Sequence, residues 1–151
     1  MKIKDRRREA EIRKRSGKAP RGSVLKSLPL DSSSLSVAYQ LTERVSRLGF
    51  DWPDLKGVLK KLNEEMKEFR EALSLQDRKR MREEMGDLLF VLVNLSRFLG
   101  INPEQALRKT VKKFISRFQY IETSLQKRRK AFDQSNLAEM DQLWEEAKKK
   151  I

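Results

Sequence analysis

Two acidic clusters hold the residues best suited to chemistry in this sequence. They are Glu64-Glu65-x-x-Glu68 and Glu83-Glu84-x-x-Asp87. Each cluster lies in a segment with helical periodicity, and a short connection at residues 74–77 lets the two helices turn back on each other. Carboxylate oxygens are the ligands that Mg²⁺ prefers in proteins. The pattern therefore predicts a carboxylate cage for Mg²⁺ between two antiparallel helices, with Mn²⁺ as a substitute ion.

The helical wheel places these acids beside an apolar stripe and not opposite it. Glu65 and Glu68 lie in a row next to the core-facing stripe of residues 55–73, while Glu84 and Asp87 share a row of the next helix with Asn94. A carboxylate near a core is costly unless it is paired, and two neighbouring carboxylates disfavour each other's ionisation. A divalent cation removes both problems. The alternative is an ordinary solvated surface, since 38% of the residues are charged.

The composition excludes several kinds of chemistry. The 151 residues include no cysteine and no histidine, which removes disulfides, thiol catalysis and histidine-based nucleophilic or zinc schemes. The absence of cysteine also fits a cytoplasmic protein. The charged N-terminus has no apolar segment typical of a secretory signal, and the longest apolar run, Leu88 to Val93, is too short to span a membrane.

The first 30 residues are expected to form a flexible basic tail. Residues 1–27 hold eleven Lys/Arg and three Asp/Glu, a net charge of +8 out of +13 for the chain. An alternative is an arm that binds nucleic acid or another anion. The segment lacks interleaved aromatic residues, so stacking on single strands is not supported.

Residues 31–151 are predicted to form an all-α domain, an antiparallel bundle of about five helices with the metal site between two core helices. The first expected helix begins at a cap among Ser32–Ser34 and ends near Leu48, and the second has Pro53 in its first turn and ends near Leu73. The third begins at a cap at Asp77 and ends at Gly100, and the fourth begins at Asn102-Pro103 and ends near Lys130. The fifth begins at a cap at Asn136 and runs to the end of the chain.

The third expected helix is apolar almost all round between Asp87 and Leu99. A helix of this kind must be covered on several sides. In a chain of this length a second subunit is a ready source of that cover, so we expect a homodimer. The alternative is that the first and last helices cover it within a monomer.

The two acidic clusters, taken with several flanking motifs, resemble the MazG family of all-α nucleoside triphosphate pyrophosphohydrolases. Besides the clusters, the motifs are Gly49-Phe50-Asp51-Trp52, Glu83-Glu84-Met85-Gly86-Asp87-Leu88-Leu89-Phe90, Val93-Asn94-Leu95-Ser96-Arg97-Phe98-Leu99-Gly100 and Lys113-Phe114-x-x-Arg117-Phe118. They follow one another in the family's order over residues 36–150. The chain is similar to the second unit of members that carry two units in tandem, with the first unit absent.

The resemblance implies Mg²⁺-dependent hydrolysis of a nucleoside triphosphate to the monophosphate and pyrophosphate, as in the removal of unwanted nucleotides. The implied metal ligands are Glu65, Glu68, Glu84 and Asp87. Glu64 or Glu68 would orient the attacking water, so the catalytic set is Glu64, Glu65, Glu68, Glu84 and Asp87. The nucleotide would meet Lys61, Arg80, Asn94, Lys113, Arg117, Trp144 and Lys148.

Some of these residues have simpler interpretations. Trp144 lies on an amphipathic helix, where a tryptophan usually belongs to the core, although the resemblance places it against the base. Asn94 would either reach the sugar or form a hydrogen bond across a dimer interface. Arg80 stands where related sequences often have lysine, which keeps the charge.

Two other functions are weighed against the enzyme. The basic tail and the lysine-rich stretches at 109–113 and 127–130 would suit a helical module that binds nucleic acid, although inward-facing acids would repel phosphate without a metal. The chain could also be an inactive structural relic of a two-unit protein, but all four signature acids are present.

Overall fold

The computed structural model describes residues 23–26, 28 and 31–151. The predicted basic tail therefore lies almost wholly outside the described residues. Those residues form five α-helices and one short 3-10 helix, with no β-strand among them, which confirms the all-α class. None of the helices seen in this part of the chain has the length and apolar character needed to cross a membrane.

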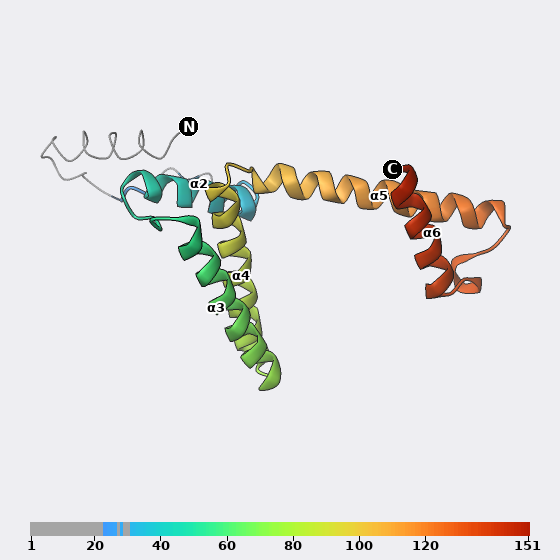
Figure 1. Cartoon of the computed structure of the whole chain (residues 1–151), viewed down its shortest axis with the longest axis horizontal. Helices are drawn as coiled ribbons and strands as arrows, with labels where there is room; N and C mark the ends of the chain where they lie inside the picture. Colours follow the sequence, from blue (N-terminus) through green and yellow to red (C-terminus); the bar gives the residue numbers. More distant parts are fainter. Residues whose placement is uncertain (1–22, 27, 29–30) are drawn as a thin grey trace, which may run out of the picture. The chain divides into compact units, whose positions relative to one another are not determined.

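The chain divides into two compact units, and each is described by itself. The first ends at Glu104 and contains α2 (Ser34–Arg47), α3 (Leu55–Ser74) and α4 (Arg78–Phe98). The second begins at Gln105 and contains most of α5 (Pro103–Lys127), the 3-10 helix η1 (Phe132–Gln134) and α6 (Leu137–Lys150) (Figure 1). The five helices are thus distributed over two units.

Polar side chains cap the helices where the sequence predicts them. The hydroxyl of Ser33 accepts a hydrogen bond from the backbone N–H of Ser36 (3.3 Å) at the start of α2. Asp77 accepts from the N–H groups of Lys79 and Arg80, both at 3.0 Å, at the start of α4. Each such cap satisfies donors that have no partner within the helix and contributes about 1 kcal/mol.

One predicted helix start is wrong. Pro53 was expected in the first turn of α3, but the helix begins at Leu55. Asp54 is the N-cap, and its carboxylate accepts from the backbone N–H of Gly57 (3.0 Å). A side-chain acceptor at this position fixes the first turn, so proline precedes the helix instead of opening it.

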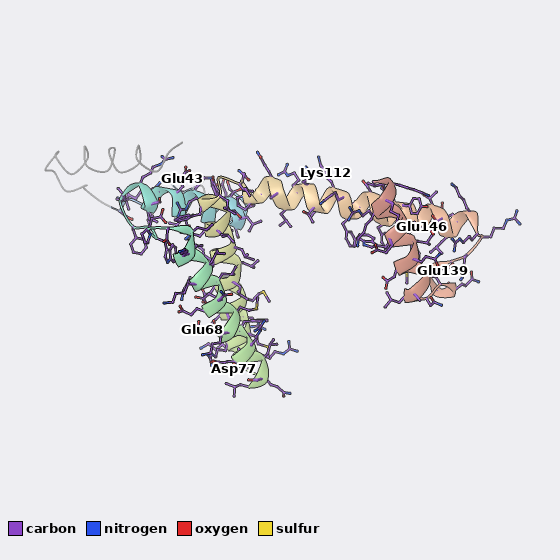
Figure 2. All side chains as sticks on the ribbon, viewed as in Figure 1. Glu43, Glu68, Asp77, Lys112, Glu139 and Glu146 are labelled. Carbon is purple, nitrogen blue, oxygen red and sulfur yellow. The ribbon has the colours of Figure 1, made fainter. Side chains whose placement is uncertain are left out.

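A tight hairpin makes α3 and α4 antiparallel neighbours, as predicted. Gln76 adopts a left-handed backbone conformation (φ +53°), and the N–H of Asp77 returns to the carbonyl of Ala72 (3.1 Å). Asp77 lies at the tip of this hairpin (Figure 2). The hairpin brings the two acidic clusters, one from each helix, onto facing elements.

The row of α3 that faces inward differs from the predicted stripe. Val58, Glu65 and Ala72, seven residues apart, are the buried residues of α3. Much of the predicted core stripe is exposed instead; its exposed members are Leu55, Leu59, Met66 and Leu73. Periodicity identifies an apolar face but does not say whether the same chain covers it.

The second unit has its own small core between α5 and α6. Ile121, Leu125 and Leu143 are buried there, with Tyr120, Met140 and Trp144 packed against them. Asn136 caps α6, its side-chain oxygen accepting from the N–H of Glu139 (2.9 Å). The Glu139 carboxylate receives Lys130 Nζ (2.5 Å), Arg128 Nη1 (2.9 Å) and Ser135 Oγ (2.9 Å), which ties the end of α5 and the following loop to α6 (Figure 2).

Candidate active site

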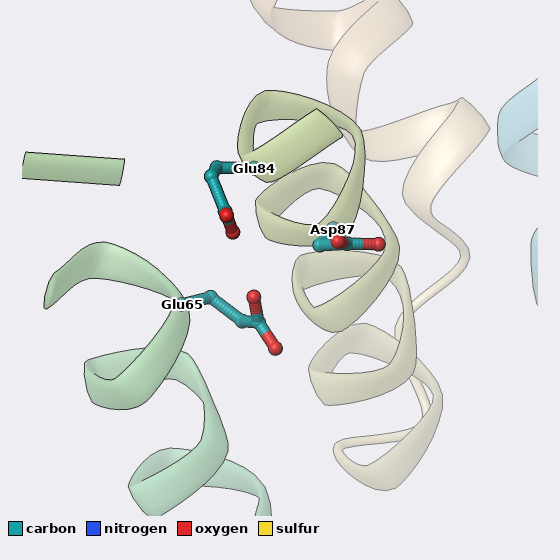
Figure 3. A group of neighbouring side chains, drawn as sticks. All are labelled: Glu65, Glu84 and Asp87. Carbon is teal, nitrogen blue, oxygen red and sulfur yellow. The ribbon is translucent and has the colours of Figure 1, made fainter. Parts of the chain in front are cut away.

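Three carboxylates from α3 and α4 meet between the two helices. One oxygen of Glu65, one of Glu84 and one of Asp87 all lie within 4.8 Å of one another. Figure 3 shows the carboxyl groups of Glu65 and Glu84 directed toward each other across the space between the helices. Glu65 is 5% exposed and Glu84 is 9% exposed. The donor set is purely carboxylate oxygen, which suits a hard divalent cation.

The two remaining acids of the first cluster have different surroundings. Burial raises the pKa of the Glu68 carboxyl, and the negative charges of Glu65 and Glu84 raise it further. Glu68 thus lies near Glu65 and Glu84, although it is not one of the three grouped acids. Glu64 is exposed, and its hydrogen bond from Lys61 holds the pKa of its carboxyl below the usual range.

Both helices supply a basic residue one turn before the inward acid. Lys61 Nζ lies 2.6 Å from Glu65 Oε1 and 2.8 Å from Glu64 Oε1. Hydrogen bonds to Glu64 and Glu65 raise the pKa of the Lys61 ammonium above its usual value. Arg80 Nε lies 3.5 Å from Glu84 Oε1, and its Nη2 lies 3.7 Å from Glu71 Oε2. The predicted cations Lys61 and Arg80 therefore do lie at the acid cluster.

Farther along α4, a buried polar network joins Asn94 to the segment before α3. Asn94 Oδ1 accepts a hydrogen bond from Arg97 Nε (2.9 Å). The guanidinium of Arg97 also binds both carboxylate oxygens of Asp51, at 2.9 and 2.5 Å. Burial acts to raise the pKa of Asp51, but hydrogen bonds from Arg97 and Ser46 outweigh it, and the pKa lies below its usual value. The bond from Arg97 uses the side-chain oxygen of Asn94, so the side-chain nitrogen is the atom that could donate to a ligand.

A cavity of about 200 Å³ opens above this network. Its lining residues are Leu41, Thr42, Val45, Phe50, Asp51, Trp52, Phe90, Asn94 and Arg97. The Thr42 hydroxyl donates hydrogen bonds to carbonyl oxygens of its own helix, Ala38 O at 2.9 Å and Tyr39 O at 3.0 Å. The cavity is therefore mainly aromatic and aliphatic. Its other polar lining residues, Asp51, Asn94 and Arg97, belong to the network described above.

The other predicted nucleotide-binding residues belong to the second unit. The Arg117 guanidinium lies 5.7 Å from the centre of the Trp144 ring, and Arg117 Nε is buried without a hydrogen-bond partner. Trp144 is half-buried and packs on Phe114, with ring centres 5.1 Å apart. Lys148 pairs with Glu145 (2.7 Å), and Lys113 is exposed on α5. Within this unit Trp144 has the packing role that its helical position favours.

Comparison with known proteins identifies the family. Residues 54–121 match the MazG nucleotide pyrophosphohydrolase domain. This stretch of the chain is a MazG domain. The matched stretch includes both acidic clusters, Asn94, Lys113 and Arg117, whereas Trp144 and Lys148 lie beyond it.

Individual MazG relatives support the same assignment. A Thermotoga maritima protein, nucleoside triphosphate pyrophosphohydrolase/pyrophosphatase MazG, is 44% identical over 115 residues, which are 76% of this chain and 44% of the relative. The nucleoside triphosphate pyrophosphohydrolase of Escherichia coli K12 is 35% identical over 129 residues, 84% of this chain and 49% of the relative. The chain thus spans less than half the length of these MazG relatives.

Asp51 and Arg97 were quoted in the MazG-like motifs but were given no role by sequence reasoning. They stand 46 residues apart, and no helical or strand period connects them. The signal that could have found them is charge, because an acid and a base that each stand in an otherwise uncharged motif need a partner. Phe50, Trp52 and Phe90 were likewise not recognised as the walls of a cavity.

Proposed function

We propose that this MazG chain hydrolyses nucleoside triphosphates to nucleoside monophosphates and pyrophosphate with Mg²⁺. The observation that supports this most strongly is the convergence of Glu65, Glu84 and Asp87 within 4.8 Å, inside the matched MazG domain. Glu68, whose carboxyl pKa is raised by burial and by the charges of Glu65 and Glu84, is the fourth proposed ligand. Mn²⁺ has the same preference for oxygen ligands and is expected to substitute.

A divalent cation at these carboxylates would offset charge on the phosphate oxygens and make a nearby water more acidic. The protein's own acids then orient that water. Glu68 suits this role better than Glu64, because Glu64 is already held by Lys61 at 2.8 Å. Lys61 and Arg80 supply positive charge at the edge of the cluster for the triphosphate.

The cavity lined by Phe50, Trp52 and Phe90 is proposed to hold the nucleoside part of the substrate. Asn94 and Asp87 lie seven residues apart on α4, roughly 10 Å along the helix axis. A nucleoside triphosphate is long enough to bridge that distance, with its phosphates at the acids and its nucleoside in the cavity. The Asn94 amide nitrogen would donate to an acceptor on the sugar or base.

The proposed roles of Lys113, Arg117, Trp144 and Lys148 rest on the MazG resemblance alone. They lie in the second unit, and their contact with a nucleotide is tested residue by residue. Replacing Lys113 or Lys148 with glutamine removes one exposed charge each, so an increase in KM without loss of folding would support a triphosphate contact.

The enzyme activity is tested by pyrophosphate release from a panel of ribo- and deoxynucleoside triphosphates, with Mg²⁺ and with EDTA. We expect Mg²⁺-dependent release of pyrophosphate and monophosphate, at least 100-fold slower in Glu84→Gln. Glu83→Gln is the matched control, because Glu83 is the exposed neighbour in the same helix and is not one of the grouped acids. Orthophosphate as product, or no turnover by folded protein, would contradict the proposal.

We also propose that the protein forms a homodimer through α4. Met85, Leu89, Leu92 and Leu99 are 43–53% exposed and recur at the spacing of a helix–helix seam. Sedimentation velocity should therefore give a dimer. Leu92→Glu, at the centre of this row, should give a monomer, whereas Leu75→Glu, 67% exposed beside the hairpin turn, should stay dimeric. A monomeric wild-type protein would contradict this proposal.

A further inference from the structure

The two inward acids of the cluster are each held by a base from their own helix, but unequally. Lys61 Nζ approaches Glu65 Oε1 to 2.6 Å, whereas Arg80 Nε stays 3.5 Å from Glu84 Oε1. A charged hydrogen bond at the shorter distance is among the strong ones, and the longer contact is not a normal hydrogen bond. Glu65 therefore has a resident cationic partner, while Glu84 has only a distant one.

The two ends of the Lys61–Glu65 contact differ in burial. The Glu65 side chain is 6% exposed, whereas that of Lys61 is 35% exposed. Lys61 also contacts Glu64, whose side chain is 51% exposed, at 2.8 Å. The ammonium thus bridges the buried acid and an acid at the surface. It can leave Glu65 by a small rotation of its flexible stem and keep Glu64 as a partner.

An ammonium and a divalent cation compete for a carboxylate because both bind its oxygen lone pairs and repel each other. Glu65 belongs to the group whose oxygens converge within 4.8 Å. We propose that Lys61 is a built-in counter-ion that competes with the metal for Glu65 and keeps metal affinity low until a triphosphate attracts the ammonium away. The first half of this statement rests on the metal site of the proposed function, and the second half rests also on its triphosphate substrate.

The consequence is a linkage between metal and nucleotide. A triphosphate offers Lys61 new anionic partners, which frees Glu65 for the metal. By reciprocity, bound metal then raises the affinity for the nucleotide by the same factor as the nucleotide raises the affinity for the metal. The site would therefore take up metal and triphosphate together.

The first test is calorimetric titration of the nucleotide-free protein with MnCl₂ alone. Lys61→Gln should bind Mn²⁺ about tenfold more tightly than wild type, because a positive charge close to a divalent ion is removed at a partly solvated site. Lys61→Arg keeps the charge and should stay within about twofold of wild type. Circular dichroism confirms that each variant is folded.

Lys67→Gln is the matched control. It removes the same charge from the same helix, but Lys67 contacts Glu71 at 3.9 Å with its side chain 80% exposed, and is not paired with the cluster. It should leave Mn²⁺ affinity within about twofold of wild type, since exposed charges are screened. Unchanged or weaker Mn²⁺ binding by Lys61→Gln would overturn the proposal and make Lys61 a residue that orients Glu65 or one without influence on the metal.

The second test repeats the titration with a non-hydrolysable triphosphate analogue. The analogue should raise the Mn²⁺ affinity of wild type by a factor about ten times larger than that of Lys61→Gln. An equal factor in both proteins would overturn the linkage. If Lys61→Gln binds Mn²⁺ more tightly but the wild-type protein releases no pyrophosphate, the role of Lys61 as a counter-ion is supported and only the proposed function is rejected.

Discussion

Arg97 and Asp51 form a two-bond ion pair that fastens the segment before α3 to the buried face of α4. The two guanidinium nitrogens meet the two carboxylate oxygens at 2.9 and 2.5 Å. Arg97 is 4% exposed, and its third nitrogen, Nε, donates a hydrogen bond to Asn94 Oδ1. Because the fork of arginine matches a carboxylate in only a few orientations, this pair fixes where Phe50 and Trp52 stand at the cavity.

Breaking this pair should destabilise the first unit. Arg97→Met leaves Asp51 partly buried without its cation, so we expect a loss of about 3–5 kcal/mol in the free energy of unfolding, measured with urea. Arg47→Met, which removes an exposed partner of Glu43 (3.2 Å), should cost less than about 1 kcal/mol. The double variant Arg97→Met/Asp51→Leu should recover part of the loss. Equal stability of Arg97→Met and Arg47→Met would show that the pair does not hold the segment.

The two hydrogen-bonding atoms of Asn94 can be tested separately. Asn94→Asp keeps an acceptor for Arg97, but it replaces the amide donor with a buried carboxylate that shares Arg97 with Asp51. It should therefore lose stability and raise KM for the triphosphate about tenfold. Asn94→Ala also leaves Arg97 Nε without its acceptor, so the free energy of unfolding measured with urea should fall by about 1–3 kcal/mol. An unchanged KM in Asn94→Asp would place the substrate away from this cavity.

The stability of the second unit should fall in acid through Glu139. Hydrogen bonds from Lys130 and Ser135 hold its pKa at about 2, against 4.5 for an ordinary glutamate. Because the folded-state pKa is depressed, the stabilisation is complete above about pH 4.5 and is lost as the pH falls toward 2. Thermal unfolding of wild type and Glu139→Gln should therefore differ at pH 6 and converge near pH 2.

Glu145→Gln is the control for that experiment, since Glu145 also pairs with a lysine but is 61% exposed in its side chain. Its effect on unfolding should be small at every pH, because exposed pairs contribute little. A constant difference between wild type and Glu139→Gln across the whole range would contradict the assigned titration.

Trp144 should matter for packing in the second unit. It contacts Phe114 and the cluster of Ile121, Leu125 and Leu143. Trp144→Ala should lower the free energy of unfolding by about 3 kcal/mol, at the low end for a tryptophan because the ring is only half-buried. Trp144→Phe should keep most of that stability. A Trp144→Ala protein of wild-type stability with a raised KM would give the residue a role in nucleotide binding alone.

Local features of this sequence determined where its helices begin and which residues carry its chemistry. Ser33, Asp77 and Asn136 cap helices through hydrogen bonds that span three residues or fewer, so neighbouring residues suffice to predict them. The ordered motifs around Glu65 and Glu84 likewise identified the MazG family. The start of α3 was missed by two residues because Asp54 competes with Pro53 for the first turn.

Tertiary packing alone decided which of these residues meet. Periodicity placed Glu65 and Glu68 in one row, but only the hairpin groups Glu65 with Glu84 and Asp87 and leaves Glu68 beside them. The pairing of Arg97 with Asp51 across 46 residues has no local signature. The physical reason is that helix caps and periods depend on neighbours in the chain, whereas burial and ion pairing depend on which surfaces the fold brings together.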